Sequence, residues 1–243
     1  MSDVVDVACL DTYKTGWLIS VKVVRLWKHS TFFGYTIEMV LSDIKGTRIA
    51  ATIMPNEFPT RWKEIKQGQW IQIFNFHIKE ATGSMLTTIN KHRLQLTSVT
   101  IITPIRTRSY NLYLHCFRFY DIVDRAIPFD YLIDVMGTIV NMGPLCNASN
   151  DAYEENLAYL RFEIVDALRD GRLACYARGS LAINLHDVYL RNTCESVVWV
   201  LRFWKMTNGK GIDKKSVILR SNDLCSDFLY NPVDAEVDAF RAT

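Results

Sequence analysis

Closely spaced cysteine pairs are missing from this sequence. It has six cysteines, and the nearest two, Cys175 and Cys194, lie nineteen positions apart, so no C-x-x-C occurs. Structural zinc sites usually need two cysteines a few residues apart, because a short turn must aim both sulfurs at one ion. An even number of cysteines does not make a disulfide framework in a chain without an export signal. We therefore expect reduced thiols, no metal and no cofactor.

Long apolar runs are also missing. The longest, such as Val197–Leu201, are far shorter than the roughly 20 residues of a membrane-spanning helix. The chain begins with an acidic stretch, Met1–Asp6, that lacks the basic start of a secretory signal. We expect no membrane association, and a location in the cytoplasm or the nucleus.

Catalytic patterns are equally scarce. A Gly-rich phosphate-binding loop is not found, because Gly209-Lys210-Gly211 lacks both the preceding glycine and the following Ser or Thr. His186 and Asp187 are adjacent on a predicted helix, where neighbouring side chains point about 100° apart. The sequence therefore predicts a protein that is not an enzyme. A hydrolase that uses His186 with Asp187 is a remote alternative.

Charge is distributed unevenly along the chain, although the net charge is only +2. Residues 1–108 hold fourteen Lys and Arg against eight Asp and Glu, a net charge of +6. Residues 109–243 hold fourteen against eighteen, a net charge of −4. This asymmetry favours a surface for nucleic acid or an acidic partner on the first half. The alternative is that two solvated surfaces differ by chance.

The first half is rich in short β-branched and aromatic segments that are separated by turn residues. A loop that combines a cation, aromatics and a glycine, Lys28–Gly34, separates the first two of these segments. The order predicted is strand, strand, strand, short helix, strand, strand. The segments are Trp17–Trp27, Tyr35–Leu41, Arg48–Ile53, a helix around Trp62–Lys66, Trp70–Lys79 and Met85–Leu96.

The second half repeats this plan. Its segments are Leu132–Met142, Leu157–Val165, Arg172–Ala177, a helix over Leu181–Arg191, Val197–Lys205 and Ser216–Arg220. The sequence Val40-Leu41-Ser42-Asp43 followed by Gly46 is matched by Ile164-Val165-Asp166 followed by Gly171. We therefore predict an all-β protein of two tandem OB folds. Each is a five-stranded, partly open Greek-key barrel with a short helix between strands 3 and 4.

These elements predict four regions along the chain. The first is a basic OB-fold domain over residues 1–108, followed by a connector over 109–130. A second OB-fold domain then covers 131–222, and 223–243 is predicted to be a loosely packed acidic tail.

Several segments in order resemble the large subunit of replication protein A, and above all the short plant proteins related to it. The carrying residues are Trp17-x-Ile19-x-Val21-Lys22-Val23 with Arg25-x-Trp27, Ile37–Asp43 with Gly46, Arg48-Ile49-x-Ala51-Thr52, and Leu132–Gly137. The resemblance covers the chain up to about Leu219. It implies two tandem OB folds that bind single-stranded DNA, with RNA as an alternative ligand, and hence a role in replication, repair or recombination in the nucleus.

A groove for single strands needs cations that follow the phosphates and flat side chains on which bases stack. In an OB barrel these belong on strands 2 and 3 and on the loops that join strands 1–2 and 4–5. The phosphate contacts predicted are Arg25, Lys28, Arg48, Lys79, Lys91 and Arg93. The stacking residues predicted are Trp27, Phe32 and Phe33, although one of the two phenylalanines could instead cover the barrel mouth. Arg178 and Trp204 are predicted to extend the site to the second barrel.

Alignment to the family places its main stacking aromatics at Met54, Leu96, Arg178 and Asn208, none of which is aromatic here. This observation supports a second hypothesis, a degenerate OB-fold scaffold that binds a protein partner. No segment matches the zinc-binding domain with which the family's large subunit assembles, so we do not expect membership of a three-subunit complex.

Overall fold

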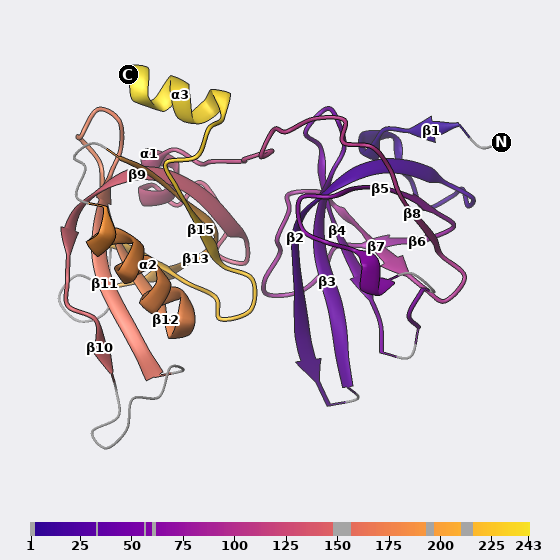
Figure 1. The fold of residues 1–243 in the computed structure, drawn as a ribbon, viewed down its shortest axis with the longest axis horizontal. Coiled ribbons are helices and arrows are strands. Elements are labelled where there is room, and N and C mark those ends of the chain that lie inside the picture. Colours follow the sequence, from indigo (N-terminus) through magenta and orange to yellow (C-terminus); the bar gives the residue numbers. More distant parts are fainter. Residues whose placement is uncertain are drawn as a thin grey trace. The chain divides into compact units, whose positions relative to one another are not determined.

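The computed structural model describes residues 3–32, 34–55, 57–59, 62–147, 157–192, 197–209 and 216–243. The chain divides into two compact units, Met1–Tyr113 and Leu114–Thr243, each built around its own β-sheet (Figure 1). The segment predicted as a connector is therefore shared. Residues 109–113 belong to the first unit and residues 114–130 to the second.

The first unit contains strands with two short 3₁₀ helices. In chain order the elements are β1 (Val4–Val5), η1 (Val7–Cys9), β2 (Leu18–Thr31), β3 (Gly34–Ser42), β4 (Arg48–Ile53), η2 (Trp62–Glu64), β5 (Trp70–Phe74), β6 (His77–Glu80), β7 (His92–Leu96) and β8 (Ile101–Pro104).

The sheet of the first unit has the OB strand order. β2 pairs with β3 and β5, β3 with β4, and β4 runs parallel to β7, which also pairs with β6. β5 and β6 together form the fourth OB strand, and they are separated by a bend at Asn75, where φ is +60°. This bend interrupts the ring of strand pairing, so the first unit is a half-barrel.

Alternation along each strand separates a core face from an outer face. On β3, the side chains of Ile37, Met39 and Leu41 are buried in the core of the first unit. Thr36 and Glu38 alternate with them and therefore belong to the outer face. The same rule assigns outer positions on every strand that pairs in register with β3.

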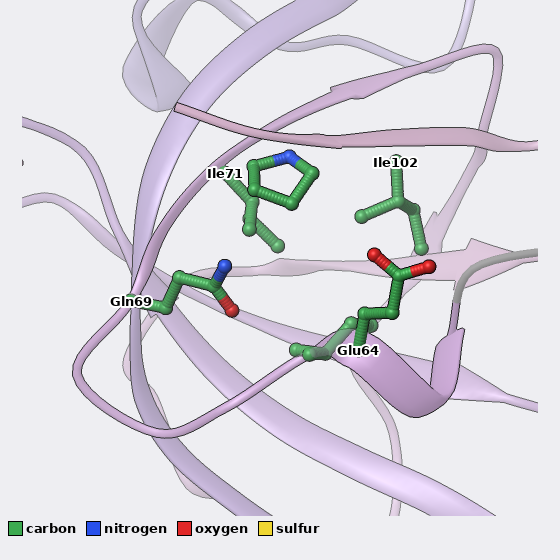
Figure 2. Close-up of a pocket in the computed structure, with 6 residues that line it drawn as sticks. Glu64, Gln69, Ile71 and Ile102 are labelled. Carbon is green, nitrogen blue, oxygen red and sulfur yellow. The ribbon is translucent and has the colours of Figure 1, made fainter. Parts of the chain in front are cut away.

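The base of the first barrel is closed by η2, as the predicted short helix requires. Ile65, which follows η2, packs into the core beside Ile71 and Ile102. Figure 2 shows the shallow depression at this junction, with Glu64 and Gln69 beside the two isoleucines of β5 and β8. It has no internal volume for a ligand.

The second unit contains strands and three α-helices. In chain order its elements are α1 (Phe119–Val123), β9 (Leu132–Met142), β10 (Cys146–Asn147), β11 (Ala158–Val165), β12 (Arg172–Arg178), α2 (Gly179–Arg191), β13 (Val198–Asn208), β14 (Val217–Arg220), β15 (Asp227–Tyr230) and α3 (Ala235–Ala242).

Strand pairing in the second unit forms a closed ring. β9 pairs with β11 and β13, β11 with β12, β12 runs parallel to β14, and β14 pairs with β13. Within the described residues this is a closed five-stranded barrel, with α2 between its third and fourth strands. The predicted all-β fold of two OB barrels is confirmed.

The sequence repeat at the end of strand 2 is also a structural repeat. The carboxylate of Asp43 accepts hydrogen bonds from the backbone N–H groups of Lys45 (3.0 Å) and Thr47 (2.9 Å). In the same way, the carboxylate of Asp166 accepts from the N–H groups of Asp170 (3.1 Å) and Gly171 (3.3 Å). An Asx-type turn therefore leads from strand 2 to strand 3 in both barrels.

Two local predictions were wrong. The predicted loop Lys28–Gly34 is mostly strand, because β2 runs to Thr31 and pairs there with Gly34. The predicted acidic tail is an ordered part of the second unit, since β15 pairs with β13 and Val237 of α3 is fully buried. Leu229 and its neighbours supply enough apolar and main-chain contacts to hold the segment despite its acidic residues.

Candidate nucleic-acid interface

The shared Asx turns allow the two barrels to be compared position by position. Strand 3 pairs with strand 2 in the same register on both sides, since Leu41 lies opposite Ile49 and Ile164 lies opposite Leu173. The outer positions of the first barrel are Thr36, Glu38, Thr52, Met54 and Gln95. The equivalent positions of the second barrel are, in that order, Tyr159, Arg161, Tyr176, Arg178 and Arg220.

The outer face of the second barrel is aromatic and cationic. Tyr176 of β12 lies in one row with Arg161 of β11 and Arg220 of β14, and this row continues to Lys205 of β13. In the next row Tyr159 lies opposite Arg178. We call these six residues, all from the described part of the chain, the tyrosine–arginine face: Tyr159, Arg161, Tyr176, Arg178, Lys205 and Arg220.

Ring geometry in this face is well defined. The rings of Tyr159 and Tyr176 stack with centroids 5.7 Å apart and planes inclined by 18°. The guanidinium of Arg161 lies 5.9 Å from the Tyr159 centroid and 6.0 Å from that of Tyr176. The guanidinium of Arg220 lies 4.9 Å from the Tyr176 centroid. Cation–π contacts of this kind hold flat side chains against the sheet while Arg161 and Arg178 remain exposed.

The phenol of Tyr159 stays neutral over a wide pH range. Its side-chain hydrogen bond with Cys146, on the paired strand β10, raises the pKa of Tyr159, and the charge interaction with the same cysteine adds to this. A neutral ring does not repel phosphate. Tyr159 can therefore present its surface beside the arginines without adding negative charge.

The outer face of the first barrel has different chemistry at the same positions. Glu38 replaces the arginine, and its carboxylate accepts a hydrogen bond from the Thr52 hydroxyl at 2.7 Å. Arg93 Nη2 lies 3.2 Å from the same carboxylate and also donates to the Thr52 hydroxyl. Trp27 lies directly opposite Glu38 on β2. The centre of this face is therefore a partly buried ion pair beside one indole ring.

A segment of main chain packs over the next part of that face. Lys22, Ser42 and Arg48 form one outer row. The Lys22 ammonium donates to the carbonyl of Asn111 at 2.6 Å, and the Arg48 guanidinium donates to the carbonyl of Tyr113, at 2.9 Å from Nε. These two cations hold residues 109–113 on the barrel, so phosphate could reach them only if the segment moved away.

The structure brings together four of the predicted site residues. By register, Arg25 and Trp27 of β2, Arg93 of β7 and Lys79 of β6 all belong to the outer face of the first barrel. Arg25 Nη1 donates to the Gln67 side chain at 3.2 Å.

The other predicted residues of the first barrel lie apart from this group. Lys28 pairs with Ile37, on the core side of the sheet, and its ammonium lies 5.0 Å from the Tyr35 ring. Lys91 is exposed just before β7. Phe32 is 96% exposed at the tip of the β2–β3 hairpin, and Phe33 lies outside the described residues.

Trp204 is a correction. It is fully buried in the core of the second barrel, where its indole N–H donates to the carbonyl of Asp227 at 3.1 Å. A base cannot stack on a ring that is inside the barrel. Leu96 is likewise fully buried, so the aligned family position there faces the core. Arg178, in contrast, is exposed on the outer face beside Tyr159.

Sequence reasoning missed Tyr159, Arg161, Tyr176 and Arg220. The available signal was alternation, because these residues alternate with Leu160, Phe162, Cys175 and Leu219, all of which are buried. The net charge of −4 concealed them, since it says nothing about which face carries the cations.

No group of three or more potential metal ligands occurs among the residues that the structure describes. The described cysteines are free thiols, and burial raises the pKa of Cys175 well above its usual value. In the same part of the chain, no helix is both long and apolar enough to cross a membrane.

The second unit also has an apolar pocket of about 520 Å³ away from the tyrosine–arginine face. It lies where the start of α1, the turn after β11 and the end of α3 meet, and Phe117, Met136 and Phe240 line it.

Comparisons with solved structures agree with this architecture. A replication protein A heterotrimer bound to ssDNA matches with a TM-score of 0.58 and 16% identity, over 98% of this chain and 54% of that chain. This chain thus spans about half the length of the matched one. The p202 HIN1 domain in complex with a 12-mer dsDNA matches with a TM-score of 0.48 and 13% identity, over 89% and 93%. DNA-binding domain A of Saccharomyces cerevisiae replication protein A matches with a TM-score of 0.34 and 19% identity, over 44% and 96%.

No curated protein sequence matches the chain. A family model described as a domain of unknown function, DUF223, matches residues 8–125, a little under half of the sequence. In fold, the chain is similar to the OB-fold chain of the replication protein A structure.

Proposed function

We propose that this protein binds single-stranded DNA and performs no catalysis. The observation that carries the proposal is the tyrosine–arginine face on strands 2, 3 and 5 of the second barrel. OB folds use the face of strands 2 and 3 to bind oligonucleotides. Residues of the two kinds that single-strand binding requires, stacking rings and phosphate-binding cations, occupy that face together.

The geometry suits a flexible single strand better than a duplex. Base stacking on an aromatic side chain contributes about 1–3 kcal/mol per base and tolerates any base. Bases in a duplex are already stacked on one another, so the two tyrosines have no ring to bind there. The arginines attract phosphates of either form, and their contribution falls as salt rises because bound counterions are released.

The biological role follows the resemblance to replication protein A. We propose that the chain shields or holds single strands during replication, repair or recombination, and that it acts in the nucleus. The matched structure is described as bound to ssDNA, which supports this choice of ligand over RNA.

Fluorescence anisotropy of a labelled thirty-nucleotide oligo-dT tests the proposal. Titrations at two salt concentrations, with unlabelled duplex as competitor, measure affinity, salt dependence and strand preference together. We expect salt-sensitive binding that duplex does not displace. Absence of binding at low salt would overturn the proposal.

A second candidate function rests on the first barrel. Its outer face lacks the tyrosines and arginines of its counterpart, and residues 109–113 pack over part of it. This favours a scaffold that binds a protein partner. A chain that fails to bind oligo-dT but retains a specific protein from nuclease-treated lysate would support the scaffold.

A further inference from the structure

We propose that the chain holds single strands on its second barrel alone, and that Glu38 keeps them off the first. This inference rests on the proposed function and assigns it to one of two barrels of the same fold. It reverses the expectation from net charge, which favoured the basic first half.

Glu38 occupies the centre of the outer face of the first barrel. Its neighbours in register are Trp27 on β2 and Thr52 on β4. A strand that stacked a base on Trp27 would have to place its phosphates near the Glu38 carboxylate. Only 16% of the Glu38 side chain is exposed, so solvent screens its charge less than that of a surface carboxylate.

Arg93 does not offset this repulsion for an incoming phosphate. Its guanidinium lies 3.2 Å from Glu38 and also donates to the Thr52 hydroxyl, with 32% of its side chain exposed. To bind phosphate, Arg93 would have to leave a partly buried carboxylate. The ion pair therefore costs the first barrel one cation as well as adding one anion.

The neighbouring outer row is covered as well. Lys22 and Arg48 donate to main-chain carbonyls of Asn111 and Tyr113. The indole N–H of Trp70 donates to the carbonyl of Ser109 at 3.0 Å. Three side chains thus bind residues 109–113 in the place where a strand would cross the sheet.

The second barrel has the opposite charge at the position equivalent to Glu38. Arg161 is exposed there and contacts two tyrosine rings at once. A charge reversal at one position, with tyrosines replacing Thr36 and Thr52, separates a binding face from a non-binding one. One OB fold covers about 4–16 nucleotides, so a short oligonucleotide should fill the site.

Ultraviolet cross-linking of oligo-dT to the full chain, followed by peptide mapping, tests the proposal without any substitution. We expect cross-linked peptides from β11 and β12 and none from β2 or β3. Cross-links on both barrels, in a chain that binds oligo-dT, would overturn this inference and leave the proposed function standing. Failure of the unmodified chain to bind any single strand would overturn both.

Matched substitutions give a second measurement. Tyr176→Ala should weaken oligo-dT binding at least tenfold, whereas Thr52→Ala, at the equivalent position of the first barrel, should change it less than twofold. Equal losses in the two variants would contradict a single binding barrel.

Glu38→Gln tests the role of the carboxylate directly. The Gln oxygen still accepts from Thr52, so the variant should fold, and a thermal melt checks this. We expect at least a threefold gain in affinity at low salt, new cross-links on β2 or β3, and a salt slope steeper by about 0.7, the value for one phosphate contact on a single strand.

Glu80→Gln is the matched control. It removes the same charge from the same unit, but alternation places Glu80 on the side opposite Lys79, away from the outer face. It should change affinity less than twofold. A gain with Glu38→Gln no larger than with Glu80→Gln would show that the carboxylate does not guard the face.

Discussion

The two barrels of this chain share a strand order, an Asx turn and a core built by the same alternation, but their outer faces differ in chemistry. One face places Glu38 beside Thr52 and Arg93, whereas the other places Arg161 beside two stacked tyrosines. Core positions are constrained because each must fill the barrel, and outer positions are not. A duplicated fold can therefore keep its architecture while one copy loses or gains a ligand.

The largest expected effect removes both rings from the second face. Tyr159→Ala combined with Tyr176→Ala should weaken oligo-dT binding by about 2–6 kcal/mol, because each stacked base contributes about 1–3 kcal/mol. Thr36→Ala with Thr52→Ala is the equivalent pair in the first barrel and should change binding by less than about 0.5 kcal/mol. Anisotropy titrations of the four-residue set measure the contrast, and similar losses would remove the distinction between the faces.

The next effect concerns the turn that the barrels share. Asp43 is almost fully buried and accepts from the N–H groups of Val7, Lys45 and Thr47, whereas Asp166 is half-buried and accepts from two. Hydrogen bonds to a charged group are worth about 1.5–3 kcal/mol each.

Asp43→Ala should therefore lower the free energy of unfolding by roughly 3 kcal/mol or more. Asp166→Ala should cost about 1–2 kcal/mol, since water can replace its bonds more easily. Urea denaturation followed by tryptophan fluorescence measures both. A larger loss from Asp166→Ala would reverse the ranking of the two turns.

A smaller effect isolates the cations of the second face. Arg161→Gln with Arg220→Gln should weaken binding roughly tenfold at low salt and flatten the salt slope by about 1.4, since each phosphate contact on a single strand contributes about 0.7. Arg169→Gln with Arg191→Gln removes the same charge from the same unit at exposed positions off the face. If both pairs flatten the slope equally, binding depends on the net charge and not on the face.

The smallest effect tests the cations that the sequence suggested first. Lys79→Gln with Lys91→Gln removes two exposed charges of the first barrel. We expect a change of about twofold at low salt and none at physiological salt, because surface charges are screened beyond roughly 8–10 Å. A tenfold loss would return the main binding site to the first barrel.

Trp27 and Trp204 show how far the sequence could lead toward the site. Both were predicted to stack on bases from their aromatic character and their place in the chain. By register, Trp27 belongs to the outer face, whereas Trp204 is fully buried. The difference comes from a register shift between Leu201 and Trp204, where β13 pairs irregularly with β9. A one-residue shift moves a side chain to the other face, and propensity does not detect it.

Arg48 illustrates a second limit. Its type and its strand were predicted correctly, but its guanidinium donates to the carbonyl of Tyr113, sixty-five residues later in the chain. A sequence pattern cannot foresee that a distant segment returns to a particular cation. Whether an arginine is structural or functional depends on such returns.

By itself, the sequence determined the strands, the helices between strands 3 and 4, and the repetition of one fold, because alternation and turn residues act over a few neighbouring positions. Only the tertiary structure decided which residues share a face. Strand pairing brings Arg161, Tyr176 and Arg220 into one row across three strands, although they are separated by up to fifty-nine positions in the chain. The chemistry of the candidate site arises from that register, which depends on how the whole barrel closes.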